Sequence, residues 1–372
     1  MKEASVVIVG AGLSGLYAAY LLEKQGIHDY VILEARSRLG GRLLSETSGE
    51  ARFDLGATWY WPEMQPKLDD VVKELGLRTF QQHESGMVVV EQTPSTPARR
   101  FNGMYAESPQ SLRIEGGMAS MVERLAEFVP GEKILSSHRV IRIDQAEKST
   151  ALVEAMGADE VLYRIRTSHV LLALPPRLVI DSIEFQPPLP TLLARDWAEC
   201  PTWMAPHAKY VAVYPQPFWR EQGLSGSGRS YSGPMVEIHD ASPAHGQGAI
   251  FGFIGVPASA RKKVSPDELI GLCRAQMARL FGIEALTPTV DWLKDWSQDE
   301  FTATTADVNF GGGHASAPAS TPRNDSWEGR VTGIASEWSI EYSGYVAGAI
   351  DAAARGLAPL LARRRVTASA GS

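Results

Sequence analysis

Cysteine is scarce in this chain of 372 residues, which contains only Cys200 and Cys273. Two cysteines cannot form a disulfide framework or a four-cysteine metal site, and this usage makes a reducing cytoplasm the expected compartment. The eight histidines show neither the H-x-x-x-H spacing nor the pairing with cysteine that is typical of a metal site. The sequence therefore predicts a cytoplasmic protein without a resident metal.

Long apolar runs and an excess of positive charge are also lacking. No apolar run reaches the roughly 18 residues that a membrane span requires, so we expect no transmembrane segment. The net charge of −7 argues against a nucleic-acid partner, which needs a basic surface. Hydrophobic residues make up 44% of the chain, enough for the cores of two globular domains.

A glycine motif stands close to the start of the chain. The apolar residues 6–9 lead directly into Gly10, Gly12 and Gly15, spaced as G-x-G-x-x-G, and a helix-favouring run over 16–22 follows. This order predicts a buried parallel strand, a tight turn and a helix. The first glycine permits the turn, the second lets a pyrophosphate approach the backbone, and the third lets the helix pack closely on the strand. The amino end of that helix favours an anion.

An acidic residue and a second glycine-rich loop support the same interpretation. Residues 30–33 form a second apolar strand that ends at Glu34, at about the spacing of 20 residues expected for the acid that binds a ribose hydroxyl. Gly40, Gly41 and Arg42 follow. Two adjacent glycines suit a loop that lies over phosphate, and the forked guanidinium suits oxygen atoms. The chain is therefore predicted to bind a dinucleotide.

Three segments together resemble one family. GAGLSGL over 10–16, LEARSRLGGR over 33–42 and FDLGATW over 53–59 are similar to motifs of the flavin-containing monoamine oxidases, which have a glutathione-reductase-like nucleotide fold. The resemblance implies FAD as the cofactor. It places the first glycines and Glu34 on the ADP half of FAD, and residues 40–42 and 56–58 over the pyrophosphate and the flavin.

The resemblance continues through the middle and the end of the chain. It implies that the backbone of Val140 contacts adenine, that Trp296 matches a tryptophan of the family, and that Glu337 bonds a ribityl hydroxyl. A helix starting at residues 344–346 would direct its N–H groups toward the flavin, which suits negative charge on a reduced flavin. The predicted cofactor contacts are Gly10, Gly12, Leu13, Ser14, Gly15, Glu34, Ala35, Arg36, Gly40, Gly41, Arg42, Gly56, Ala57, Thr58, Val140, Trp296, Glu337, Gly344, Tyr345 and Val346.

Lys209 and Tyr345 are the predicted catalytic residues. The family has a lysine at the first position, bridged by water to the flavin N5, and a tyrosine of an aromatic cage at the second. Thr305 stands where the flavin-linking cysteine of the family would fall, so we expect tightly but non-covalently bound FAD. Ala306 takes the place of the other cage tyrosine. Candidate substitutes for that ring are Phe310, Trp338 and Tyr342.

The predicted fold is α/β with two domains, a Rossmann-like FAD domain and a mixed-sheet substrate domain with helices. We expect the FAD domain to comprise residues 1–61, 111–180 and 321–372. The substrate domain would comprise 62–110 and 181–320. The insertion over 62–110 is much shorter than in the animal enzymes of the family, and a homodimer could cover a site that such an insertion leaves open. The sequence does not decide the oligomeric state.

The resemblance implies oxidation of an amine at its C–N bond. Hydride would pass to flavin N5, the imine would hydrolyse to an aldehyde, and O2 would be reduced to H2O2, so the expected partners are a small-molecule amine and O2. One alternative is FAD-dependent C–C dehydrogenation of the desaturase or porphyrinogen oxidase type, against which Lys209 and Tyr345 speak. Another is a catalytically silent FAD-binding module, suggested by the short insertion and the incomplete cage. A simple amine, a polyamine and an amino acid all remain open as substrates.

Overall fold

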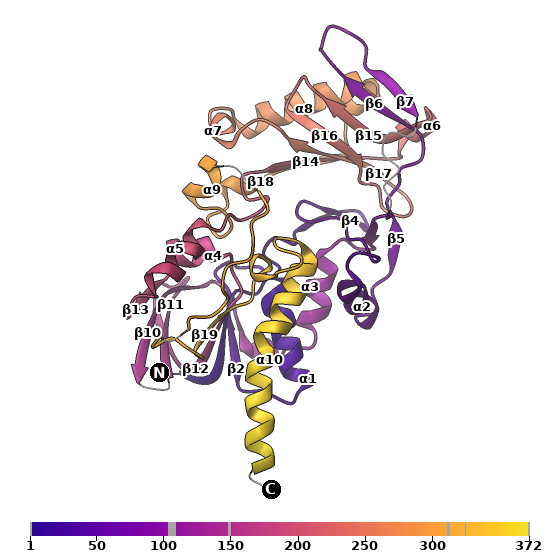
Figure 1. Ribbon diagram of the computed structural model, residues 1–372. Coiled ribbons are helices and arrows are strands. Elements are labelled where there is room, and N and C mark those ends of the chain that lie inside the picture. Colours follow the sequence, from indigo (N-terminus) through magenta and orange to yellow (C-terminus); the bar gives the residue numbers. More distant parts are fainter. Residues whose placement is uncertain (1, 103–108, 148–149, 311–312, 324, 371–372) are drawn as a thin grey trace.

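The computed structural model describes residues 2–102, 109–147, 150–310, 313–323 and 325–370, which fold into two lobes (Figure 1). The lower lobe in that view contains the first strand and the last helix, and the upper lobe contains segments from the middle of the chain. Each lobe is built on one large sheet with helices packed against it. The predicted α/β class is confirmed.

An eight-stranded sheet forms the lower lobe, in the order β13-β10-β11-β12-β1-β2-β9, with β19 also paired to β12. The interior strand β1 pairs in parallel with β12 on one side and β2 on the other. Residues 6–9 are buried on both faces, as expected for an apolar run inside a parallel sheet. The strands are β1 (Lys2–Val9), β2 (Tyr30–Leu33), β9 (Ile134–Leu135), β10 (His138–Glu147), β11 (Thr150–Gly157), β12 (Leu162–Leu172), β13 (Glu184–Gln186) and β19 (Val331–Gly333).

Helices cover both faces of this sheet, which buries two separate apolar clusters. On one face, α1 (Leu13–Lys24) packs against α3 (Ala119–Ala126) and α10 (Val346–Ala370). On the other face lie α4 (Pro176–Ser182) and α5 (Thr191–Glu199), together with Trp197, Trp327 and Trp338. The long α10 extends away from the lobe at its far end (Figure 1).

A seven-stranded sheet forms the upper lobe, in the order β18-β14-β17-β16-β15-β6-β7. All its pairs are antiparallel except β15 with β6. Met277 and Phe281 on the inner side of α8 (Pro266–Phe281) pack against one face of the sheet. The strands are β6 (Met87–Glu91), β7 (Arg99–Asn102), β14 (Ala208–Tyr214), β15 (Leu224–Ser230), β16 (Met235–Asp240), β17 (Gly248–Ile254) and β18 (Val290–Asp295).

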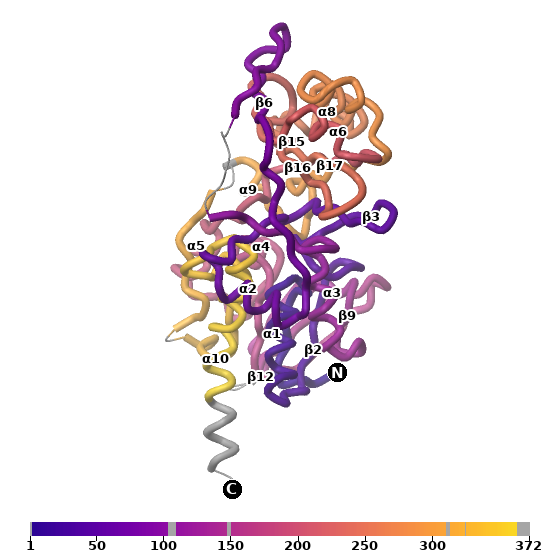
Figure 2. Tube along the Cα trace, turned by 90° about the vertical axis from the view of Figure 1, so that its right-hand side faces the viewer, coloured from indigo at the N-terminus to yellow at the C-terminus, as the bar shows by residue number. Residues whose placement is uncertain are grey.

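The second face of the upper sheet rests on the lower lobe. Phe53 and Leu55, at the end of β4 (Ala51–Asp54), pack on Val211 and Phe251 of the sheet. The molecule is elongated, with β6 at one end and α10 at the other (Figure 2). The remaining elements are β3 (Ser45–Ser48), β5 (Thr79–Gln81), β8 (Leu112–Ile114), α2 (Pro66–Glu74), α6 (Phe218–Glu221), α7 (Ala258–Arg261), α9 (Thr305–Phe310), η1 (Gly131–Lys133), η2 (Ile283–Leu286), η3 (Trp296–Gln298) and η4 (Ser336–Trp338).

The lower sheet extends beyond the segment over 111–180 expected from the sequence. β13 (184–186) pairs in parallel with β10, and α5 packs on α4 in the same lobe. The chain therefore leaves the lower sheet for the second time after residue 186 and not at residue 180. A short strand at a sheet edge carries little periodicity of its own, so the sequence gives no signal for this pairing.

Candidate active site

One cavity of about 580 Å³ is lined by residues of both lobes. Its lining includes the glycine turn after β1, the loop after β2, the loop after β4, the start of β14 and the start of α10. The predicted site residues that line it are Gly10, Gly12, Leu13, Ser14, Glu34, Ala35, Arg36, Gly40, Gly41, Arg42, Gly56, Ala57, Thr58, Val140, Lys209, Trp296, Gly344, Tyr345 and Val346. The fold thus brings together segments that are far apart in the sequence, while Gly15 and Glu337 lie outside the lining.

The three glycines of the first turn occupy three different environments. Gly10 has a φ of +104°, and a Cβ there would lie 2.9 Å from the carbonyl oxygen of Ala173. A Cβ on Gly15 would lie 2.0 Å from the carbonyl oxygen of Gly10, so this position serves the close packing of α1 on the turn. A Cβ on Gly12 would meet no atom within 4 Å, and Gly12 lines the cavity. The open space at the amino end of α1 fits a pyrophosphate group.

Glu34 is held at one end of the cavity by the backbone. The residue is 3% exposed, and its carboxylate accepts hydrogen bonds from the N–H of Ala11 at 2.7 Å and the N–H of Arg36 at 2.9 Å. Arg36 in turn forms an ion pair with Asp299 and donates to the Oγ1 of Thr302 at 2.9 Å. A carboxylate fixed beside the glycine turn fits the ribose of an adenosine group.

Arg42 and Glu337 form an ion pair that joins two segments far apart in the sequence. The Arg42 guanidinium donates to the two carboxylate oxygens of Glu337 at 2.6 and 3.0 Å and to the Oγ of Ser336 at 3.1 Å. Arg42 and Ser336 line the cavity, whereas Glu337 is 1% exposed and does not. This differs from the direct ribityl contact predicted for Glu337, because the arginine covers its carboxylate. The phosphate contact predicted for Arg42 stays a prediction.

Lys209 lies inside the cavity wall at the start of β14. It is 2% exposed, and its Nζ donates to the Oγ1 of Thr58 at 2.6 Å and to the carbonyl oxygen of Gly56 at 3.2 Å. Burial lowers the pKa of Lys209 to about 7, because the attraction of Asp54 offsets only part of the desolvation. The amine can therefore gain or lose a proton near neutral pH.

Tyr345 belongs to a group of three rings. The Trp203 ring lies 4.8 Å from the Tyr345 ring between centroids, and the His314 ring stacks on Tyr345 at 4.8 Å with an interplanar angle of 12°. Trp203 and Tyr345 line the cavity, while His314 is exposed and does not line it. The ring that accompanies Tyr345 is therefore Trp203, which the sequence interpretation did not identify.

The substitutes predicted for the second cage ring lie elsewhere. Trp338 is 1% exposed and packs edge to face on Trp197 in the core of the lower lobe. The hydroxyl of Tyr342 donates to the carbonyl oxygen of Met64 at 2.8 Å, and this residue does not line the cavity. The side chain of Phe310 lies outside the described residues. The prediction was therefore wrong for Trp338 and Tyr342.

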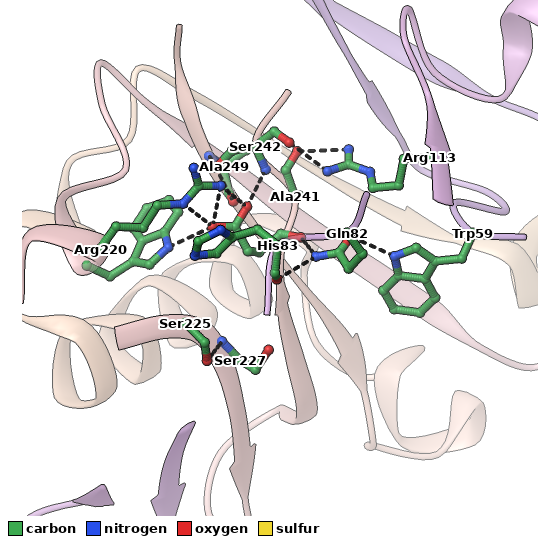
Figure 3. A network of polar contacts seen from close by, with 12 residues as sticks. Trp59, Gln82, His83, Arg113, Arg220, Ser225, Ser227, Ala241, Ser242 and Ala249 are labelled. Atoms are coloured by element: carbon green, nitrogen blue, oxygen red, sulfur yellow. Dashed lines mark hydrogen bonds and ion pairs between the residues drawn. The ribbon is translucent and has the colours of Figure 1, made fainter. Parts of the chain in front are cut away.

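A polar network fixes the cavity wall formed by Trp59 (Figure 3). The indole N–H of Trp59 donates to Gln82 at 2.8 Å, and the amide of Gln82 donates to the carbonyl oxygen of Asp240 at 2.8 Å. Arg113 donates to the carbonyl oxygens of Ala241 and Ser242 at 2.9 and 2.7 Å. These bonds join the lower lobe to the carboxyl end of β16, which holds that part of the wall in one position.

The lining residues that sequence reasoning missed include Trp203, Phe253 and Glu237. Trp203 stands shortly before Lys209, and that proximity is the one signal that could have singled it out. Phe253 and Glu237 lie on β17 and β16, and their sequence patterns are those of ordinary strand residues. Only the pairing of β17 with β14, and of β16 with β17, places them in one row with Lys209.

The cavity fits a flavin dinucleotide in its chemistry as well as its lining. Its lining includes a carboxylate beside an open glycine turn, a loop that carries an arginine, a buried lysine and two aromatic residues. FAD supplies hydride chemistry that amino-acid side chains cannot. This arrangement defines the class of protein as a flavin-dependent oxidoreductase.

The comparisons with known proteins name the family. The family profile described as flavin containing amine oxidoreductase matches residues 97–356, and the profile of an NAD(P)-binding Rossmann-like domain matches residues 8–75. The chain belongs to the flavin containing amine oxidoreductases. It is a flavin-dependent amine oxidase with FAD as its cofactor.

Curated relatives cover nearly the whole chain. Putrescine oxidase of Kocuria rosea is 26% identical over 84% of this chain and 86% of its own length. The flavin-containing amine oxidase B of Homo sapiens is 24% identical over 97% of this chain and 86% of its own length. The predicted family, enzyme class and cofactor are confirmed, and C–C dehydrogenation is not favoured.

Solved structures share the fold. A mutant of putrescine oxidase matches with a TM-score of 0.80 at 24% identity, covering 97% of this chain and 99% of that chain. Cyclohexylamine oxidase from Brevibacterium oxydans matches with a TM-score of 0.79 at 20% identity, covering 97% of this chain and 99% of that chain. In the part of the chain that the structure describes, no helix has the length and apolar character of a membrane span, and no three or more acidic, histidine or cysteine side chains gather as a metal site would require.

Proposed function

We propose that the chain oxidises a small primary amine at the carbon next to its nitrogen, with O2 as the electron acceptor. The amine loses a hydride and a proton, and water hydrolyses the resulting imine to an aldehyde and ammonia. FAD, when bound, accepts the hydride and passes two electrons to O2, which with two protons becomes H2O2. One observation carries the proposal: Lys209 and Tyr345 line the same cavity as Gly12 and Glu34. Relatives named for putrescine and for amines support it.

Lys209 is assigned the proton chemistry of the reoxidation step. Its amine is held in place by Thr58 and Gly56, and its pKa of about 7 lets it carry a proton at one stage and release it at another. When protonated, it stabilises negative charge that develops beside it in a water-poor cavity. An ordered water that joins this amine to the flavin is part of the assignment.

Tyr345 and Trp203 are assigned the positioning of the amine. Their rings touch, so no substrate fits between them, and the neutral amine would lie on the cavity side of the pair. The negative faces of both rings favour the partly positive hydrogens of the amine over a bulky apolar group. Tyr345 directly precedes α10, so the tyrosine ring is held at a fixed position relative to the amino end of this helix. In this proposal that helix end faces the flavin.

FAD is proposed to be held without a covalent bond. Of the described residues that line the cavity, none is a cysteine, and Cys200 and Cys273 are both buried elsewhere. Thr305 is exposed at the start of α9 and does not line the cavity. We also propose the discontinuous division into an FAD domain and a substrate domain, which the two large sheets support, with the second departure from the lower sheet placed after residue 186.

The stoichiometry of turnover tests the proposal. The FAD-loaded protein is mixed with a panel of primary amines, and O2 uptake, H2O2, aldehyde and ammonia are measured together. We expect equal amounts of all four for at least one amine. If the bound flavin is reduced by none of the amines but by a saturated C–C substrate, the dehydrogenase alternative replaces the proposal. If no reductant yields H2O2, the chain is a silent FAD-binding module.

A further inference from the structure

Five residues form one row across the upper sheet on the face that meets the cavity. Lys209 pairs directly with Lys294 of β18 and with Phe253 of β17. Phe253 pairs in turn with Glu237 of β16, and Glu237 pairs with Arg229 of β15. Residues that are directly opposite on neighbouring strands project from the same face of a sheet. Lys209, Phe253 and Glu237 all line the cavity, so this row runs along its wall.

The row also has a direction. Its β18 end lies toward the adenosine side, because Lys294 and Arg36 both bind Asp299. From there the row passes Lys209 and continues away from the nucleotide-binding loops to Glu237. Two strand spacings separate the backbones of Lys209 and Glu237, which is about 10 Å. A substrate whose reacting carbon lies near Lys209 would therefore run past Phe253 and reach Glu237 with its other end.

Glu237 presents an ionised carboxylate at that far end. Its Oε1 lies 2.8 Å from the Nε2 of His239, and its other oxygen lies 3.8 Å from Arg229. The hydrogen bond from His239 lowers the pKa of the carboxyl group. The side chains of Glu237 and Arg229 are 39% and 47% exposed, so their ion pair contributes little. An ammonium group inside the cavity would be less exposed to solvent than Arg229 is. Its ion pair with Glu237 would therefore be stronger than that of Arg229.

A second pocket of about 390 Å³ begins where the first ends, because Val236 and Glu237 line both. Its other lining residues come from β15, the turn that follows it, and the end of β17: Arg229, Ser230, Tyr231, Gly233, Gly255 and Val256. The carboxylate of Glu237 therefore stands at a junction and not at a closed end. A chain longer than the first cavity can pass the carboxylate and continue into the second pocket.

Hydrogen bonds from both lobes fix the carboxyl end of β16. Asp240 at its end is fully buried and accepts hydrogen bonds from the indole N–H of Trp219 and from the guanidinium of Arg220, each at 2.9 Å. The same network reaches Arg113 and Gln82 (Figure 3). A strand fixed in this way holds a binding carboxylate at a constant distance from the reaction site, which discrimination by chain length requires.

We propose that Glu237 binds a second, non-reacting ammonium group of the substrate, so that the substrate class is a linear diamine or a longer polyamine. The inference rests on the proposed function, since it names the substrate of the same cavity. One amine reacts beside Lys209 while the other pairs with the carboxylate. An ω-amino acid such as 4-aminobutanoate would bring a carboxylate to the same place and be repelled, so it should be a poor substrate.

Three probes with a four-carbon chain test the proposal on the FAD-loaded enzyme: 1,4-diaminobutane, butylamine and 4-aminobutanoate. We expect kcat/KM to be about 10- to 100-fold higher for the diamine than for butylamine, because a hydrogen bond to a charged group contributes that much. We expect the lowest kcat/KM for 4-aminobutanoate. In Glu237→Gln the ratio of diamine to butylamine should fall toward one. Glu284→Gln, at an exposed position on η2, is the matched control and should keep the ratio.

The outcomes separate the two proposals. If butylamine and the diamine react equally in the wild type, or if Glu237→Gln keeps the ratio, the second ammonium site is excluded while amine oxidation stands. A preference for 4-aminobutanoate would assign the far end to Arg229 and also exclude it. If none of the three reduces the flavin in any variant and the wider panel fails as well, the proposed function itself is lost. The flavin absorbance of each variant shows that the protein has folded around its cofactor.

Discussion

The guanidinium of Arg42 and the carboxylate of Glu337 form a bidentate ion pair, with N–O distances of 2.6 and 3.0 Å. Arg42 follows the second glycine loop, and Glu337 lies in η4 after β19, so the pair ties an early segment of the chain to a late one. Glu337 is 1% exposed. Removing one member of such a pair leaves the other charge without compensation.

Glu337→Ala should lower the free energy of unfolding by about 1–3 kcal/mol, because the partly exposed guanidinium of Arg42 loses its partner. The double variant Arg42→Met with Glu337→Leu should cost less than the sum of the single changes. The exposed pair of Arg52 and Glu123 is the control, and Glu123→Ala should cost no more than about 1 kcal/mol. Denaturant unfolding of these three variants and of the single variants Arg42→Met and Glu337→Leu measures these values. Equal losses for Glu337→Ala and Glu123→Ala would contradict the buried-pair interpretation.

Two glycines of the first turn should respond differently to alanine. Gly15→Ala places a Cβ 2.0 Å from the carbonyl oxygen of Gly10, so the cofactor-free protein should lose at least about 1–3 kcal/mol of stability. Gly12 has an ordinary φ of −74° and open space around it, so Gly12→Ala should fold normally. Its methyl group would instead fill the space of the pyrophosphate and weaken FAD binding at least about tenfold, or 1.4 kcal/mol. Thermal unfolding without FAD, and titration with FAD, separate the two effects; the reverse pattern would refute the assignment.

Glu34→Gln should weaken FAD binding by about 10- to 100-fold, which is the loss of one charge-assisted hydrogen bond to the ribose. The amide also offers only one oxygen to the two backbone N–H groups of Ala11 and Arg36. The dissociation constant is measured by adding FAD to cofactor-free protein. Glu132→Gln, at an exposed position in η1, serves as the control. An unchanged dissociation constant in Glu34→Gln would remove this residue from the site.

Lys209 makes stability depend on pH in a definite direction. Its pKa is about 7 in the folded protein and about 10.4 in the unfolded chain. Between these values the unfolded chain binds more protons, so the contribution of this residue to stability rises with pH through that window. The advantage in Tm of Lys209→Met over the wild type should therefore be largest below about pH 7 and shrink toward about pH 10. A constant difference in Tm across this range would mean that the pKa is not depressed.

The nucleotide side of the site could be predicted from the sequence because its signals are local. A strand, three glycines, a helix and an acid at the end of the next strand follow one another within a short stretch, and each position has a fixed steric or charge requirement. The structure places Gly12, Glu34 and Arg42 around one cavity accordingly. The position of Lys209 came from the resemblance to a family, and its burial and low pKa could not be read from the strand pattern alone.

The substrate side could not be predicted, because it depends on contacts between distant segments. Trp203 meets Tyr345 only after the segment before β14 and the start of α10 come together in the folded chain. Glu237 shares a face with Lys209 because β17, which is later in the sequence than β16, lies between β16 and β14. A one-residue shift in register would turn the Glu237 side chain to the opposite face. No periodicity in the sequence specifies this order of strands.

Anaerobic mixing of the purified, FAD-loaded enzyme with a primary amine measures the central claim most directly. The flavin absorbance is followed through one turnover in the wild type and in a variant in which Tyr345 is replaced by alanine. We expect complete bleaching of one flavin per chain in the wild type, and bleaching at least about tenfold slower in the variant, since the amine loses its positioning ring. A wild-type flavin that stays fully oxidised with every amine, diamines included, would contradict amine oxidation in this cavity.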